Sequence, residues 1–245
     1  MTTAHLGVRH TGSMQLHVVA DQTERDGGFV LERLVEHGAI PTFLDRDDLP
    51  TFPVDTPPDL VLLLGSQRSA HDPRHGDVVA HESAYVLAAL ASGVPIAAIC
   101  YGAQLAARAL GGTSYRADDP EIGWRRVDTE DPVLCPEGPW GQFHQDVAAP
   151  PPTSRVLGTS WAGPQCFVDD SLGGRLIAWQ FHPEVTPQTF ERWVRENESL
   201  VRSTGASPDD LVREGQERAA AYRNRAHALT DAALSYLRVD TKTHA

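Results

Sequence analysis

The 245-residue sequence has few of the features that mark secreted, metal-binding or membrane proteins. Its three cysteines, Cys100, Cys135 and Cys166, form neither an even set nor a paired metal-ligand spacing. We therefore expect no disulfide and no metal site. No apolar run approaches the roughly 20 residues of a membrane helix, and the first ten residues lack the apolar segment of a signal peptide. These absences predict a cytoplasmic protein.

Basic patches are missing as well. The formal net charge is −12, from 21 basic and 33 acidic residues, and no Lys/Arg-rich block is present. This balance argues against nucleic acid or an anionic membrane as the main partner. The sequence also lacks internal repeats, low-complexity segments and the phosphate-binding pattern G-x-x-x-x-G-K-[ST]. With 41% apolar residues, the chain has enough material for a sizeable core.

Residues 94–112, VPIAAICYGAQLAARALGG, predict a strand, a sharp turn and a helix. The apolar run over residues 94–99 has the length of an inner strand of a parallel sheet, and Cys100 follows it. Residues 104–110 are rich in strong helix formers. Unpaired N–H groups at a helix N-terminus stabilise a thiolate and a developing oxyanion, so this position suits a nucleophile. The alternative is a buried small hydrophobe, which is the commoner role of a lone cysteine.

Strand and helix patterns surround this stretch. We expect strands over residues 14–20, 40–44, 59–64, 121–127, 155–160, 165–169 and 175–181. We expect helices over residues 29–36, 78–92, 187–195 and 209–237. Residues 46–58 contain four prolines and are predicted to form a loop.

A second motif, AWQFHPEV at residues 178–185, brings His182 and Glu184 within two positions of each other. Nucleophilic catalysis by a thiol needs an imidazole within reach and a carboxylate on the far nitrogen of that imidazole. Together the two motifs resemble the class I glutamine amidotransferases, whose cysteine turn reads G-x-C-x-G-x-Q and whose distal motif reads Q-F-H-P-E. The resemblance covers nearly the whole chain. It implies that Cys100 is the nucleophile, His182 the general base and Glu184 the orienting carboxylate.

The resemblance also implies an oxyanion hole. Gly65, at the end of an apolar strand, would supply one backbone N–H group, and Tyr101 would supply another. The sequence departs from the family at two positions. Many members have a second glycine where this chain has Ser66, and the family usually has glycine where this chain has Ala98. The alternative interpretation of the Gly65 segment is a plain turn between a strand and a helix.

Four residues are implied as substrate ligands. Gln104 would bind the substrate glutamine, although by itself it could equally be a solvated or capping residue. Phe143, His144 and Gln145 lie where the family holds the α-amino and α-carboxylate groups of the substrate, with Asp146 in a supporting position. His144 as the general base is the weaker hypothesis, because no carboxylate follows it in the pattern of H-P-E.

The fold implied by the resemblance is a flavodoxin-like three-layer α/β/α sandwich with a mixed, mostly parallel central sheet. The segment EIGWRRV at residues 121–127 is typical of the branch related to the amidotransferase domain of GMP synthetase. We expect a disordered N-terminus over residues 1–13, an amidotransferase domain over residues 14–200 and a helical extension over residues 201–245. The extension would dock on the chain's own sheet or on a partner.

The function implied is that of a glutaminase. It would release glutamate and ammonia from glutamine, need no metal or organic cofactor, and pass the ammonia to a separate synthetase or ligase chain. Two alternatives remain. One is a γ-glutamyl hydrolase or transpeptidase that uses the same three residues. The other is a catalytically silent, partner-binding relative, against which the intact Cys100, His182 and Glu184 count.

Overall fold

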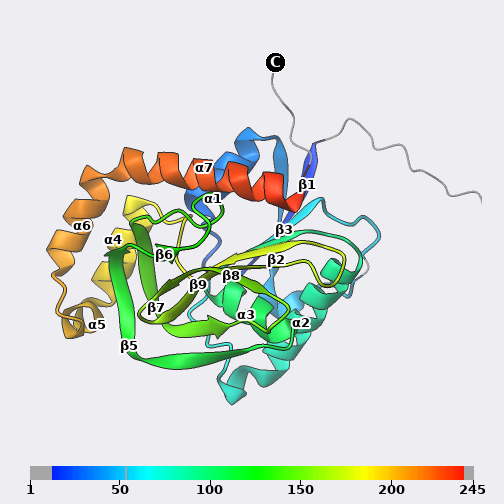
Figure 1. Ribbon diagram of the computed structural model, residues 1–245, viewed down its shortest axis with the longest axis horizontal. Helices are drawn as coiled ribbons and strands as arrows, with labels where there is room; N and C mark the ends of the chain where they lie inside the picture. The colour runs from blue at the N-terminus through cyan, green and yellow to red at the C-terminus, as the bar shows by residue number, and fades with distance from the viewer. Residues whose placement is uncertain (1–12, 53, 240–245) are drawn as a thin grey trace, which may run out of the picture.

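The computed structural model describes residues 13–52 and 54–239, so all but Ser13 of the N-terminal segment predicted to be disordered lies outside the described residues. Eight strands form one sheet in the order β2-β1-β3-β4-β10-β9-β8-β6 (Figure 1). Their bounds are β1 Met14–Ala20, β2 Ala39–Asp45, β3 Leu60–Leu63, β4 Ile96–Ile99, β6 Asp128–Thr129, β8 Arg155–Ser160, β9 Gly163–Asp169 and β10 Leu176–Trp179. Strands β2, β1, β3, β4 and β10 are parallel, whereas β9, β8 and β6 add an antiparallel edge. This is the mixed, mostly parallel sheet that was expected.

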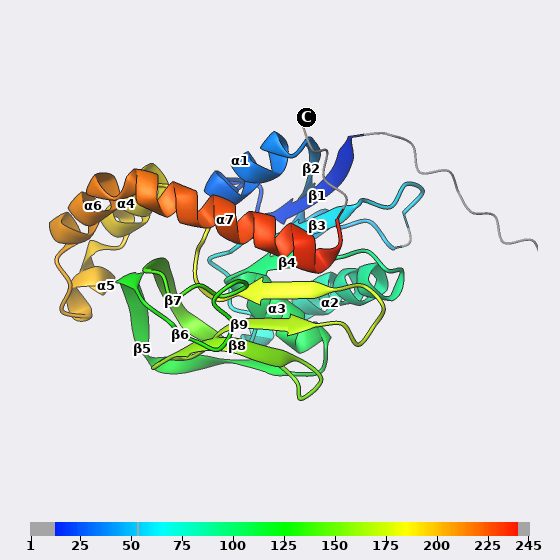
Figure 2. The same ribbon diagram turned by 45° about the horizontal axis from the view of Figure 1, so that its top comes forward.

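Helices cover both faces of the sheet (Figure 2). Their bounds are α1 Gly28–Glu36, α2 Gly76–Ala91, α3 Tyr101–Ala109, α4 Pro187–Glu196, α5 Glu198–Ser203, α6 Pro208–Glu217 and α7 Ala219–Leu237, with short 3₁₀ helices η1 Arg46–Asp48 and η2 Pro73–His75. Successive residues of a strand point to opposite faces. Leu16 and Val18 of β1 therefore pack with α1 and α7, whereas Val19 packs with α2 and α3. The three-layer α/β/α sandwich is confirmed.

Several element boundaries differ from the sequence prediction. Helix α3 begins at Tyr101 rather than at residue 104, because the N–H of Gln104 already donates to the carbonyl of Cys100. The helix predicted over residues 209–237 is divided into α6 and α7 at Arg218, just after the turn of α6 that contains Gly215. The loop predicted over residues 46–58 begins with the single turn of η1.

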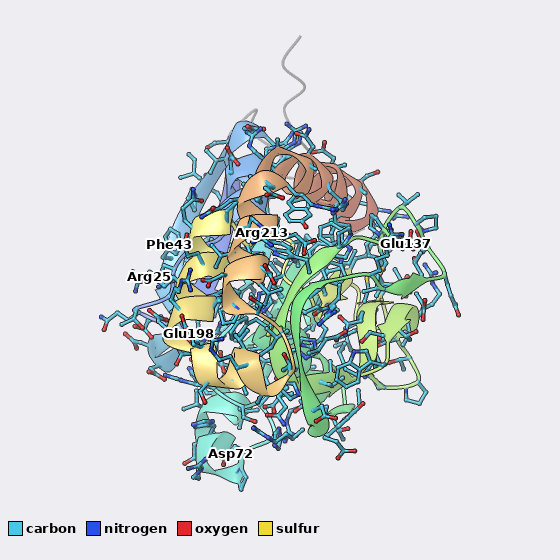
Figure 3. The ribbon with its side chains drawn as sticks, turned by 90° about the vertical axis from the view of Figure 1, so that its left-hand side faces the viewer. Arg25, Phe43, Asp72, Glu137, Glu198 and Arg213 are labelled. Carbon is cyan, nitrogen blue, oxygen red and sulfur yellow. The ribbon has the colours of Figure 1, made fainter. Side chains whose placement is uncertain are left out.

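A small second sheet was only partly predicted. Strand β5, Thr113–Arg125, is longer than the expected segment 121–127, and it pairs antiparallel with β7, Trp140–Ala149. The added residues carry mostly polar side chains and are largely exposed, so they show no apolar strand pattern. Helices α4 and α6 pack beside this sheet (Figure 3). Phe190, Val201 and Val212 share an apolar cluster there with Trp124 of β5.

The last helix packs against the chain's own core. Leu229, Leu234 and Leu237 of α7 are buried in the same apolar cluster as Leu16 of β1. Nε and Nη2 of Arg33 on α1 each donate to a carboxylate oxygen of Asp231 on α7 at 2.8 Å. Within the described part of the chain, no helix combines the length and the apolar character that a bilayer crossing needs.

The packing of α7 predicts a specific loss of stability. Leu234 is 3% exposed, so Leu234→Ala should lower the free energy of unfolding by about 2–5 kcal/mol. The matched control is Leu172→Ala, because Leu172 is 37% exposed and its truncation should cost less than about 0.5 kcal/mol. Urea denaturation followed by circular dichroism measures both values. Equal stability of the two variants would contradict the docking of α7 on the core.

Candidate active site

The strand register brings three residues of the site into one row. Leu63 of β3 pairs with Ala98 of β4, which pairs with Ala178 of β10. Two positions further along, the same register aligns Gly65, Cys100 and Gln180 at the carboxyl ends of these strands. Ligands of open α/β sheets bind at this edge.

Cys100 occupies a sharp turn between β4 and α3. Its backbone has φ 51° and ψ −109°, with a positive φ that residues with side chains rarely adopt. The N–H of Cys100 donates to the carbonyl of Trp179 on β10 at 2.8 Å, which holds the turn against the neighbouring strand. On the other side, a Cβ at Gly102 would lie only 2.5 Å from the carbonyl oxygen of Leu63. Glycine at this position therefore lets α3 start close to β3.

His182 and Glu184 follow β10 directly. Nδ1 of His182 lies 2.7 Å from Oε1 of Glu184, and both residues are 5% exposed. The backbone N–H of His182 donates to the carbonyl of Gly141 on β7 at 2.8 Å. The carbonyl of Glu184 accepts from the N–H of Phe29 at 2.9 Å, and Gly28 packs so closely that a Cβ there would lie 1.8 Å from this oxygen. Helix α1 thus fixes the turn that carries the carboxylate.

The groups around His182 determine the pKa of its imidazole. Burial lowers the pKa of the imidazole, but the negative charge of Glu184 and the contact with Cys100 outweigh burial and raise the pKa to about 10. Nε2 of His182 is buried and has no hydrogen-bond partner among the described residues. The imidazole of His182 is therefore favoured in its protonated form at neutral pH.

A cavity of about 370 Å³ opens over these groups. Of the catalytic, oxyanion and substrate residues singled out from the sequence, those that line it are Gly65, Cys100, Gln104, Phe143, His144, Gln145, Asp146, His182 and Glu184. Tyr101 does not line the cavity, because its side chain is turned inward and its hydroxyl donates to Glu82. Only the backbone of Tyr101 remains available for a role in an oxyanion hole.

Gln104 and His144 hold different positions in the cavity wall. Nε2 of Gln104 donates to the carbonyl of Asp146 at 3.1 Å, while its Oε1 is buried without a partner among the described residues. Both ring nitrogens of His144 are engaged: Nε2 lies 3.0 Å from Oε1 of Gln142 and 3.2 Å from Glu121, and Nδ1 lies 3.1 Å from the carbonyl of Asp146. This arrangement argues against His144 as the general base.

Three residues at the site were not expected from the sequence. Gln180 stands inside the Q-F-H-P-E motif, and its Nε2 lies 3.7 Å from Sγ of Cys100. Trp193 lies in the helix predicted over residues 187–195, and its ring is edge-on to His182 with 4.8 Å between centroids. Exposed Arg192 lies on the rim of the cavity beside it. The Q-F-H-P-E motif could have indicated Gln180. For Trp193, helical spacing alone does not show whether the side chain lies in the core or lines the cavity.

One group of side chains outside the cavity is close enough together to be considered as a metal site. Among the described residues, Glu32, Glu36 and His227 gather where α1 meets α7. Arg223 binds both carboxylates, at 2.9 Å and 3.2 Å, and Arg33 binds Glu36 at 2.7 Å. We interpret the cluster as an ion-pair network between the two helices, because arginines already compensate its acidic groups.

Comparison with known proteins agrees with this geometry. The family model of class I glutamine amidotransferases matches residues 32–200. The chain belongs to this family. The resemblance drawn from the cysteine turn and the H-P-E motif is thereby confirmed, and with it the class of enzyme.

Relatives of this class I amidotransferase include glutamine-hydrolysing GMP synthases, which confirms the predicted branch. One from Thermus thermophilus is 34% identical over 176 residues, covering 66% of this chain and 33% of the relative. One from Aeropyrum pernix is 32% identical over 162 residues, covering 63% of this chain and 30% of the relative. The chain thus spans about a third of the length of these relatives.

Solved structures share the fold of this amidotransferase. A glutamine amidotransferase from Thermotoga maritima has a TM-score of 0.76 at 22% identity, covering 91% of this chain and 98% of that one. A protein from Thermoplasma acidophilum, named as a putative subunit of GMP synthase, has a TM-score of 0.62 at 19% identity, covering 94% and 98%. Both coverages include most of the helices after the H-P-E motif.

The raised pKa of His182 is open to direct measurement. We expect its ring nitrogens to keep imidazolium chemical shifts through neutral pH and to titrate near pH 10. Glu184→Gln removes a negative charge that favours the protonated ring, so the pKa should fall toward 6.5. The control Glu196→Gln changes an exposed carboxylate on the cavity rim and should have little effect, because solvent screens it. Nitrogen-detected NMR provides the titration curves, and a wild-type midpoint near 6.5 would contradict the charge state given above.

Proposed function

We propose that this chain hydrolyses the side-chain amide of glutamine and supplies the ammonia to a separate synthetase or ligase. The observation that carries the proposal is the meeting of Cys100, on its strained turn, with the His182–Glu184 pair in one buried cavity floor. A nucleophile, a base and an orienting carboxylate, brought together by the fold, are the components of triad catalysis.

In the proposed mechanism, His182 has taken the proton of Cys100 before the substrate is attacked, and Glu184 stabilises the imidazolium. The thiolate attacks the γ-carboxamide carbon of glutamine, and backbone N–H groups near Gly65 and at Tyr101 stabilise the tetrahedral oxyanion. His182 then returns the proton to the leaving nitrogen, and ammonia departs. Water, deprotonated by the same imidazole, hydrolyses the γ-glutamyl thioester to glutamate and frees the thiol. The proposed steps use side chains and backbone of this chain alone.

The cavity walls support glutamine as the substrate. Oε1 of Gln104, which has no partner in the part of the chain that the structure describes, can accept a hydrogen bond from a primary carboxamide. An N-alkyl amide would place carbon where one of those hydrogens lies, and an unpaired buried acceptor costs about 1–3 kcal/mol. Phe143, Gln145 and Trp193 also line the cavity and would face the amino-acid end of the substrate.

A separate ammonia acceptor is supported by two observations. The sequence has no G-x-x-x-x-G-K-[ST] pattern for nucleotide binding. The Thermoplasma acidophilum protein is named as a putative subunit of GMP synthase. We propose that this chain is likewise a subunit, and that its ammonia acceptor is a separate chain.

The proposed roles predict a ranking of variants. Cys100→Ala and His182→Ala should each lower the glutaminase rate on the order of 10³-fold or more, because nucleophile and base act as a unit. Glu184→Gln should cost less, because the carboxylate acts through the imidazole. Steady-state glutamate release measures all three. If Glu184→Gln is as inactive as Cys100→Ala while still folded, Glu184 does more than orient the imidazole, and the proposed role is wrong.

The labelling of cysteines provides a control for this ranking. A glutamine-like diazo-ketone should modify Cys100, which lines the cavity, and spare Cys135 and Cys166, which are fully buried. Peptide mass mapping identifies the modified residue. A label found on Cys135 or Cys166 would remove Cys100 from the proposed mechanism.

Substrate preference separates the proposal from its nearest rival. We expect the isolated chain to release glutamate from glutamine, with no N-substituted γ-glutamyl amide giving a higher kcat/KM. Gln104→Ala removes the proposed hydrogen-bond acceptor. The kcat/KM values for glutamine and for its N-methyl amide should therefore differ less in this variant than in the wild type. A kcat/KM for one γ-glutamyl amide far above that for glutamine would favour a γ-glutamyl hydrolase instead.

A further inference from the structure

A buried arginine lies directly behind the proposed oxyanion loop. Arg46, in η1, is 0% exposed. Its Nη1 donates to Oε1 of Glu82 on α2 at 2.8 Å, and its Nη2 donates to the carbonyls of Leu64 at 2.6 Å and Gly65 at 2.9 Å. One guanidinium therefore binds two successive peptide groups at the point where β3 becomes the loop.

The same arginine is linked to the residue that follows the nucleophile. The second carboxylate oxygen of Glu82 accepts a hydrogen bond from the hydroxyl of Tyr101, and the guanidinium carbon of Arg46 lies 4.8 Å from the centre of the tyrosine ring. Burial raises the pKa of Tyr101, so the phenol keeps its proton and remains a donor. Arg46, Glu82 and Tyr101 thus connect the loop to the first turn of α3.

The direction of the Gly65 carbonyl determines the direction of the next N–H group. A peptide group is planar and trans, so its N–H points opposite to its C=O. Because the Gly65 carbonyl points to Arg46, the N–H of Ser66 points away from Arg46. The other side of Gly65 faces the reacting groups: a Cβ there would lie 3.4 Å from Cε1 of His182 and 3.7 Å from Cβ of Cys100.

A second arginine holds the loop further along. Arg68 makes two hydrogen bonds to the carboxylate of Asp47, at 2.6 Å and 2.8 Å, and Asp47 is the neighbour of Arg46 in η1. Its Nε also lies 3.7 Å from Asp21 at the end of β1. The segment from Gly65 to Arg68 is therefore attached to η1 at both ends, and Arg46 is the attachment nearest to Cys100.

We propose that Arg46 is a positioning residue for catalysis, which orients the Gly65–Ser66 peptide so that the loop can stabilise the oxyanion. The inference rests on the proposed glutaminase function. Stability alone does not account for the arginine, because buried ion pairs are often replaced by apolar residues without loss of stability. A planar fork that spans two carbonyls and a carboxylate is, however, something that only arginine supplies.

The test compares catalysis with alkylation of Cys100. Arg46→Lys keeps the positive charge opposite Glu82 but cannot hold both carbonyls, so we expect kcat for glutamine to fall on the order of 10²-fold with KM changed less than about threefold. Alkylation of Cys100 by iodoacetamide forms an S–C bond and expels iodide without building an oxyanion. Its rate should therefore stay close to that of the wild type.

Two further variants complete the design. Arg46→Met combined with Glu82→Gln removes both charges of this pair, so that Glu82 is not left unpaired, while Asp21 keeps its contact with Arg68. This double variant should show the same selective loss of kcat. Arg213→Lys changes an exposed arginine on α6, labelled in Figure 3, and should leave both rates unchanged.

The outcomes separate the inference from the function on which it rests. Wild-type kcat in the Arg46 variants would overturn the positioning role while leaving the glutaminase intact. Parallel loss of glutamine turnover and of iodoacetamide alkylation would show a structural role only, and would likewise overturn the inference. A wild-type chain that hydrolyses neither glutamine nor any γ-glutamyl amide would overturn the proposed function itself.

Discussion

The positive-φ backbone conformation of Cys100 is the constraint on which the site depends. Such a conformation costs about 1–3 kcal/mol and persists only where the surroundings determine it. Here β10 binds the N–H of Cys100 on one side, and Gly102 lets α3 approach β3 on the other. Because β3, β4 and β10 are neighbours in parallel register, the packing that holds the turn also brings Gly65 and Gln180 beside the thiol.

Two buried ion pairs lie on different sides of this turn. The pair between His182 and Glu184 faces the cavity, whereas the pair between Arg46 and Glu82 lies behind the loop at Gly65. Burial of charge is expensive unless each group is paired and hydrogen-bonded. Both pairs are tied to the backbone, through the N–H of His182 and through the carbonyls of Leu64 and Gly65. Each ion pair therefore also fixes the position of a chain segment, through the hydrogen bonds to its backbone.

The helices after the H-P-E motif belong to the site and to the core. Helix α4 begins with Thr186 as its N-cap and Pro187 at its first position, which directs it across the cavity and sets Trp193 against His182. Helix α7 returns to cover the sheet through its leucines and through Asp231. In the described residues the extension is continuous with the sandwich, because its apolar side chains enter the same clusters.

Local signals in the sequence determined the strand, turn and helix around Cys100, the parallel sheet and the H-P-E turn, because apolar runs, glycines and short motifs act within a few residues. Tertiary structure alone decided which distant groups meet. Arg46 stands in a polar, proline-rich segment that carries no sign of burial, yet η1 places it against Glu82 from another helix. The spacing of Trp193 in its helix does not reveal its contact with His182. His144 is a possible base by sequence, but in the structure its Nε2 is already in contact with Glu121 and Gln142. Such contacts depend on how the helices and the sheet pack together, and the local sequence around each residue does not indicate which distant residue it will meet.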